Sequence, residues 1–204
     1  MPIVRKRVVQ PITHVFADDG NIPNNAWPLV LYRGGIDLAG SPDPEALIEK
    51  TFTTNGWGGL WRNGIYPYVH YHSMIHEAMA VARGRAKVRF GGDRGEAIDV
   101  MAGDVVVLPA GTGHQRLSQT PDLVVIGAYP PNGQYNLCRG SKAERVQALA
   151  VIPNVPPPEN DPVFGPDGPL LGPDPPPPQP VKSAQVRTNR EKAPNRTSVF
   201  IELD

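Results

Sequence analysis

Short stretches in which apolar and polar residues alternate dominate the chain from residue 58 onward. In the segment 85–90, Ala86, Val88 and Phe90 alternate with three cationic residues, which predicts a strand with one buried face. The same reading predicts further short strands, separated by turns rich in glycine, proline or aspartate, at 28–32, 58–64, 66–72, 78–83, 97–100, 104–108, 114–118 and 123–129. Many short strands at close spacing are typical of a β-sandwich or barrel.

Two segments have the features of helices instead. The sequence Ser41-Pro42-Asp43-Pro44 is typical of a helix start, because proline fits a first turn and Ser41 or Asp43 can cap free N–H groups. The apolar residues that follow share one helical face until Asn55-Gly56 ends the segment. A second short helix is expected over 142–149. The fold class predicted is therefore all-β with one or two short helices.

Proline is concentrated in the C-terminal quarter of the chain. Thirteen of the 25 prolines lie between Val151 and Pro180, where they disfavour both ladder strands and helices. We expect an extended, polyproline-II-rich arm that lies on the domain surface through its apolar residues; a disordered linker is the alternative. The predicted organisation is a barrel with an N-terminal extension in residues 1–150. Residues 151–204 would form the arm and a C-terminal strand (197–203) that returns to the same domain or pairs with another subunit.

Charge and cysteine content narrow the choice of partners and compartment. Lysine plus arginine equal aspartate plus glutamate at 20 each, so no overall field favours nucleic acid or an anionic membrane. The single cysteine, Cys138, cannot form an internal disulfide, which fits a reducing cytosol. We expect an ordinary free thiol there, and a nucleophile is the alternative. No apolar run reaches membrane-spanning length, and the N-terminus lacks the apolar segment of a signal peptide. A cytoplasmic protein is expected.

Four of the five histidines fall in two short segments. His70, His72 and His76 lie together with Glu77 in the sequence GIYPYVHYHSMIHEAMAVARG, and His114 ends the sequence GDVVVLPAGTGH. On a strand over 66–72, His70 and His72 would share a face. Clustered imidazoles with one carboxylate are the donor set that a divalent transition metal prefers.

Both segments resemble the two signature motifs of the cupin superfamily. The first motif is matched by the spacing Gly64-x5-His70-x-His72-x4-Glu77-x6-Gly84, and the second by Gly103-x5-Pro109-x-Gly111-x2-His114. The chain departs from the pattern at Ser118, where the family often has an asparagine that is usually not a metal ligand. The stretches DDGNIPNN and DPVFGPDGPL also resemble uncharacterised single-domain bacterial cupins. This resemblance implies a double-stranded β-helix, that is, a jelly-roll barrel.

The resemblance also implies a metal site made of His70, His72, Glu77 and His114. The odd spacing from His72 to Glu77 requires a bend or bulge between Ser73 and His76. Three histidines and one carboxylate leave one or two positions open on a five- or six-coordinate ion, as in catalytic rather than structural sites. One divalent transition metal is expected, with Fe, Mn, Ni, Co and Zn all compatible.

The remaining polar residues near the motifs have less certain roles. Strict alternation would put His76 on the same face as His70 and His72, so His76 competes with Glu77 as the fourth ligand, or else supports the site as a pocket residue. Tyr66, Tyr68 and Arg116 share strand parity with the ligands and could line the cavity, Arg116 by holding a substrate carboxylate. Alternatively, the two tyrosines are ordinary core residues and the arginine lies at the surface. Trp57 and Trp61 are expected to serve packing.

These features favour a metal-dependent enzyme that acts on a small organic molecule. Dioxygenase-like chemistry is the leading class and isomerase or decarboxylase chemistry the next, since a fold by itself does not fix a reaction. A non-catalytic module that binds a metal or ligand, or a sensory module, is the alternative from another class. We expect a homodimer whose partner is a small-molecule substrate.

Overall fold

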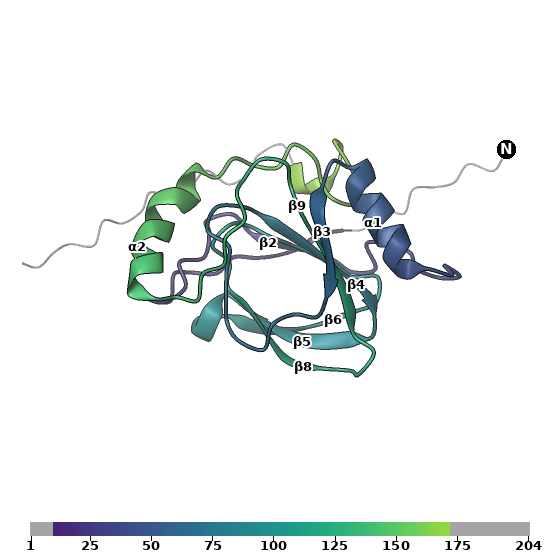
Figure 1. Ribbon diagram of the computed structural model, residues 1–204, viewed down its shortest axis with the longest axis horizontal. Helices are drawn as coiled ribbons and strands as arrows, with labels where there is room; N and C mark the ends of the chain where they lie inside the picture. The colour runs from purple at the N-terminus through teal and green to yellow at the C-terminus, as the bar shows by residue number, and fades with distance from the viewer. Residues whose placement is uncertain (1–9, 172–204) are drawn as a thin grey trace, which may run out of the picture.

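Two antiparallel sheets form the framework of residues 10–171, the part of the chain that this computed structural model describes (Figure 1). The larger sheet has the spatial order β1 (Ile12–His14), β2 (Leu29–Tyr32), β7 (Val105–Leu108), β4 (Glu77–Arg83), β9 (Val124–Tyr129) and β3 (Gly58–Asn63). The smaller sheet has the order β6 (Glu96–Met101), β5 (Arg85–Phe90) and β8 (His114–Gln119). The predicted strand over 197–203 lies outside the described residues.

The main core lies between these sheets, which face each other across the barrel (Figure 1). Alternation decides which side chains enter it: Met79 and Val81 of β4 pack in this core with Val88 and Phe90 of β5. The alanines between them on β4 belong to a second core on the outer face of the larger sheet. Strands β2, β4 and β7 are therefore buried on both faces, and the prediction of an all-β double-stranded β-helix is confirmed.

Helix α1 (Pro44–Thr54) covers the outer face of the larger sheet. Ile48 and Phe52 are fully buried there, together with Trp57. Of the two capping residues considered, Asp43 is the N-cap, and its carboxylate accepts a hydrogen bond from the N–H of Ala46. The helix predicted from the proline-containing start signal is confirmed.

Helix α2 (Lys142–Val151) lies at the other side of the barrel from α1 (Figure 1). It begins with a capping box in which Ser141 and Glu144 each accept a hydrogen bond from the other's backbone N–H. Its buried Ala148 packs in a small cluster with Ile22 and Tyr71. Among the described residues, no helix has the length and hydropathy needed to cross a bilayer.

The structure differs from the predicted strands and arm in two places. The segment 66–72 is a loop with only isolated bridges at its end, because Pro67 has no N–H to donate. The described part of the proline-rich segment is not uniformly extended: it contains the short 3-10 helices η2 (Ile152–Asn154) and η3 (Pro169–Leu171), besides η1 (Gly92–Arg94) in the β5–β6 connection. Proline fits these turns, since its fixed φ suits a first helical turn.

One buried carboxylate is central to the attachment of the segment after η2 to the outer face of the larger sheet. Asp161 is completely buried and accepts hydrogen bonds from the hydroxyl of Tyr32 (2.5 Å) and from the N–H groups of Val163, Phe164 and Leu170. Burial and the neighbouring Asp161 carboxylate raise the pKa of Tyr32, so this phenol stays a donor. The four donors satisfy the buried charge.

Replacing this carboxylate should therefore destabilise the protein strongly. We expect Asp161→Ala to lower the free energy of unfolding by about 3 kcal/mol or more, because four buried donors lose their acceptor. Asp167→Ala, at an exposed position in the same segment, should change it by less than about 0.5 kcal/mol. Urea denaturation of both variants measures the difference, and equal stabilities would contradict the role given to Asp161.

Candidate metal centre

Backbone hydrogen bonds join the two histidine-containing segments. His70 and His114 form a bridge in which each backbone N–H donates to the other residue's carbonyl, at 3.1 and 2.9 Å. The N–H of Gly111 donates to the carbonyl of His72, and Gly111 has the positive φ of 92° that this turn requires. Segments more than 30 residues apart in the sequence thus meet at one point.

Three imidazole rings converge there. His70, His72 and His114 are buried, and each offers a ring nitrogen within 4.8 Å of those of the other two. In every ring the other nitrogen, Nδ1, faces a backbone carbonyl: that of Tyr68 for His70 (3.3 Å), of Asn136 for His72 and of Thr112 for His114 (3.4 Å). A proton on Nδ1 leaves the lone pair on Nε2, which is the tautomer that a metal ligand needs.

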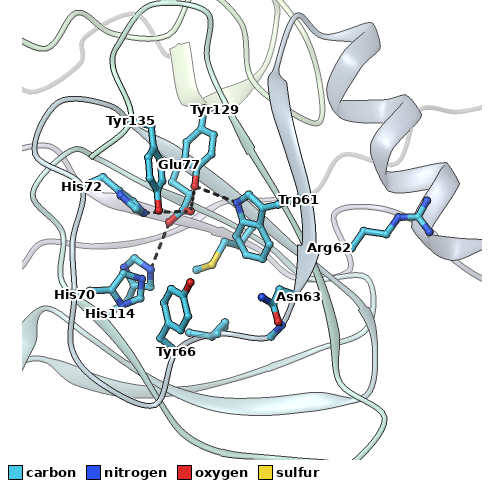
Figure 2. Close-up of a pocket in the computed structure, with 13 residues that line it drawn as sticks. Trp61, Arg62, Asn63, Tyr66, His70, His72, Glu77, His114, Tyr129 and Tyr135 are labelled. Carbon is cyan, nitrogen blue, oxygen red and sulfur yellow. Dashed lines mark hydrogen bonds and ion pairs between the residues drawn. The ribbon is translucent and has the colours of Figure 1, made fainter. Parts of the chain in front are cut away.

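Glu77 brings a carboxylate to the same point. It begins β4 and shares parity with Met79 and Val81, so its side chain enters the barrel. One carboxylate oxygen lies 3.4 Å from Nε2 of His72 and the other 3.4 Å from Nε2 of His114 (Figure 2). The chain bends over residues 73–75, as the odd spacing required.

The protonation states fit a metal site. Burial alone would raise the pKa of Glu77, but the surrounding histidines lower it to about 2, so the carboxylate is charged. Burial lowers the pKa of His114 to about 3 and also lowers that of His70, which keeps both rings neutral at pH 7. His72 is the exception: burial opposes its protonation, but Glu77 raises its pKa overall.

One buried oxygen atom is the decisive test of whether a metal fits here. Oε1 of Glu77 accepts a hydrogen bond from the hydroxyl of Tyr129 (3.1 Å), whereas Oε2 has no hydrogen-bond partner within residues 10–171. A buried carboxylate oxygen without a protein partner is costly unless a cation or a water molecule lies beside it. The three imidazoles and this oxygen are therefore a donor set that suits a divalent transition ion.

Trp61 and Tyr129 hold Glu77 in place. The indole N–H of Trp61 donates to the hydroxyl oxygen of Tyr129 (3.1 Å), and that hydroxyl in turn donates to Glu77 (Figure 2). Trp61 lies directly over Gly127, where a Cβ atom would approach its ring to 1.9 Å, so only glycine fits there. The expectation that Trp61 serves packing is thus incomplete, since it also orients Tyr129.

His76 has a different environment from the three clustered histidines. Its Nδ1 accepts the N–H of Ala110 (3.0 Å), its Nε2–H donates to the carbonyl of Pro156 (3.0 Å), and its ring stacks on Trp27. Burial lowers the pKa of His76 to about 4, so the ring is neutral as these two bonds require. Both nitrogens are engaged by the protein, which leaves His76 no lone pair to offer a metal.

A cavity of about 350 Å³ opens beside the cluster. Besides the cluster residues, its wall is formed by β3, β4, β9 and two loops through the side chains and backbone of Trp61, Arg62, Asn63, Gly64, Ile65, Tyr66, Met79, Tyr129 and Tyr135. Tyr66 and Tyr135 are partly exposed, at 41% and 56%. The cluster is therefore reachable by a small molecule.

The chain has a clear relative among known proteins. No protein-family model matches it. It is 42% identical over 160 residues to a protein of Bacillus subtilis (strain 168) described as "Uncharacterized protein YjlB", a match that covers 78% of this chain and 93% of that protein. The chain belongs to the YjlB family, and its fold is that of a cupin.

Solved structures similar to this member of the YjlB family are more distant. Acireductone dioxygenase from Bacillus anthracis is 13% identical, with a TM-score of 0.36 over 52% of this chain and 80% of that one. An uncharacterised conserved protein with a double-stranded β-helix domain from Klebsiella pneumoniae is 16% identical, with a TM-score of 0.34 over 68% of this chain and 86% of that one.

The predicted pocket residues occupy three different positions in this YjlB-family protein. Tyr66 lines the cavity. Tyr68 is not part of the wall; it stacks on Tyr66, and the guanidinium of Arg139 lies 4.0 Å from the centre of its ring. Arg116 is also absent from the wall, and its Nε donates to the carbonyl of Ile65 instead of facing a substrate carboxylate.

Sequence reasoning missed two tyrosines of the cavity. Tyr129 ends the predicted strand over 123–129, and its parity with the core residue Val125 was the signal that would have placed it inside the barrel. Tyr135 lies in a loop without periodicity, so no pattern in the sequence pointed to it. Cys138 is buried and accepts a hydrogen bond from the side-chain amide of Asn136, away from the cavity wall.

The engagement of both His76 nitrogens predicts a stability effect. His76→Phe keeps a ring to stack on Trp27 but leaves the N–H of Ala110 and the carbonyl of Pro156 without partners, so the free energy of unfolding should fall by about 3 kcal/mol. His14→Phe is the matched control, because His14 is only partly buried and its ring contacts one carboxylate, that of the exposed Glu96, in a pairing that contributes at most about 1 kcal/mol. Urea denaturation compares them, and a loss no larger for His76 would show that its two bonds do not stabilise the fold.

Proposed function

We propose that this protein binds one divalent transition ion through His70, His72, Glu77 and His114 and is a metal-dependent enzyme acting on a small organic molecule. The observation that carries the proposal is the buried, unpartnered Glu77 oxygen beside three imidazoles whose Nδ1 atoms face carbonyls. The adjoining cavity supports catalysis rather than a purely structural ion, because a structural site is closed by protein ligands.

Dioxygenase-like chemistry is the leading reaction class. When bound, the ion would supply Lewis-acid or O₂-activating chemistry, with Fe, Mn, Ni, Co and Zn all compatible with the donor set. Within residues 10–171, the cavity wall contains no histidine or acidic residue outside the proposed ligands, and no lysine. Isomerisation needs a group that moves a proton, for which the wall offers only tyrosine hydroxyls, so it ranks second, together with decarboxylation.

The residues around the ligands have defined tasks in this proposal. Tyr129 holds one oxygen of Glu77, which leaves the other free for the ion. Burial and the Glu77 charge raise the pKa of Tyr129, so its hydroxyl keeps its proton and remains a hydrogen-bond donor. Tyr66 and Tyr135 line the open side of the cavity, through which a substrate would reach the cluster.

A non-catalytic or sensory module that binds a metal and a ligand is the second candidate. Within residues 10–171, the wall has no histidine, lysine or acidic residue besides the proposed ligands, which fits such a module as well as it fits O₂ chemistry. A measured turnover of substrate would distinguish the enzyme from the non-catalytic module. A cytoplasmic location and a homodimer stay predictions.

The metal assignment predicts the metal content of histidine variants. Protein purified without added metal should contain about one first-row ion per chain, and His72→Ala and His114→Ala should each lose it, because each removes a donor from a four-donor set. His14→Ala should keep it. Elemental analysis of folded protein measures this, and an ion that survives both site substitutions would refute the assignment.

The reaction class predicts oxygen consumption. Protein reconstituted anaerobically with Fe(II) should consume O₂ when mixed with at least one compound from a panel of phenols, thiols and keto acids. The His114→Ala protein, treated identically, serves as the control for uncatalysed oxidation. An oxygen electrode records the rate, and uptake no faster than this control with every compound would reject dioxygenase-like chemistry.

A further inference from the structure

Aromatic rings surround the cavity beside the proposed metal ligands. Figure 2 shows Tyr129 and Tyr135 on one side of it and Tyr66 on another, with the indole of Trp61 between them. The rings of Tyr129 and Tyr135 meet edge to face at 5.4 Å, and Tyr66 meets His70 in the same way at 5.1 Å. Edge-to-face contacts leave ring faces available for a further planar group, and the stacked Tyr68 covers one of the two faces of Tyr66.

Two of these rings are only partly covered by the protein. Tyr135 is 56% exposed and Tyr66 41% exposed, although both line the cavity. A flat, apolar molecule between them would remove that aromatic surface from water. By contrast, Tyr129 and Trp61 already use their polar atoms in the hydrogen bonds that hold Glu77.

The wall offers no available cation. Arg62 is the one basic residue in the wall among residues 10–171, and its guanidinium donates two hydrogen bonds to Glu49, at 2.5 and 2.8 Å. In Figure 2 this side chain points away from the clustered histidines. A substrate carboxylate would thus find no cationic side chain to pair with and would depend on the ion alone, whose charge Glu77 already offsets in part.

The size of the cavity sets an upper limit on the ligand. Its volume of about 350 Å³ lies at the lower end of the range of small-molecule sites. One aromatic ring with small substituents fits this volume better than a fused or extended ring system.

We infer that the cavity binds a small, uncharged, hydroxyl-bearing aromatic molecule, held between the rings of Tyr66 and Tyr135. This inference rests on the proposed function, because it takes the cavity as the substrate site. The rings, rather than the ion, supply the selectivity, since an ion attracts oxygen ligands of many kinds.

Binding of matched probes tests this inference without turnover. Isothermal titration calorimetry of the zinc-loaded and the metal-free protein would compare 2-methoxyphenol with its saturated counterpart 2-methoxycyclohexanol and with the anion cyclohexanecarboxylate. We expect the phenol to bind about 10-fold more tightly than either comparison compound, since each aromatic contact adds about 0.5–1.5 kcal/mol beyond area burial. Equal binding of the phenol and its saturated counterpart, or tighter binding of the carboxylate, would overturn the inference.

Variants at the cavity mouth show whether the preference arises there. Tyr135→Leu should remove most of the preference, Tyr135→Phe should keep it, and Met101→Ala, at an exposed apolar position of β6 outside the wall, should leave it unchanged. An equal loss in Met101→Ala and Tyr135→Leu would overturn the inference. Tyr135 is largely exposed, so its variants should fold, and thermal unfolding checks this.

Zinc content measured on the same samples separates this inference from the proposed function. If zinc binds at one ion per chain but the phenol is not preferred, the substrate class is wrong and the metal site stands. If the phenol is preferred but zinc does not bind, the metal site is wrong and the aromatic cavity stands.

Discussion

The buried carboxylate of Glu77 is the constraint on which the rest of the site depends. Removing a carboxylate from water costs several kcal/mol unless nearby groups compensate its charge. Tyr129 satisfies one oxygen, while His72 and His114 lie 3.4 Å from the two oxygens without saturating them. The fold therefore maintains a negative centre that a cation would stabilise, and the carbonyls behind the three imidazoles direct their lone pairs toward it.

His76, the residue before Glu77 in the sequence, bonds to the protein backbone and is not part of the metal cluster. His76 donates to Pro156 and accepts from Ala110, so it ties the segment after α2 to the loop that precedes His114. Asp161 fixes the same segment to β2 through Tyr32. Both buried groups thus help hold the C-terminal part of the described chain against the barrel, and His76 also supports, through Ala110, the loop that positions His114.

The sequence predicted most of the strands and both helices, because these depend on periodicity and on local turn chemistry, whereas the convergence of the two histidine segments followed from the resemblance to the two cupin motifs. The loop at 66–72 was missed because one proline interrupts an alternation that otherwise indicates a strand. Spacing to Gly84 favoured Glu77 over His76 as the fourth ligand, but the contacts of His76 could not be predicted, since its partners Ala110 and Pro156 are distant in sequence. Tyr135 could not be predicted from the sequence for the same reason, because only the fold brings its loop to His72.

The two sides of the cavity differ in how firmly they are held. On the metal side, Trp61 orients Tyr129, Tyr129 orients Glu77, and Gly127 gives Trp61 the space to do so, so a change at any of these positions would be transmitted to the carboxylate. On the open side, Tyr66 and Tyr135 come from loops and keep much of their surface in water. Chemistry needs fixed geometry, whereas recognition tolerates adaptable contacts. Divergence among members of this family in what they bind would therefore be expected at Tyr66 and Tyr135 before it reaches Trp61, Tyr129 or Gly127.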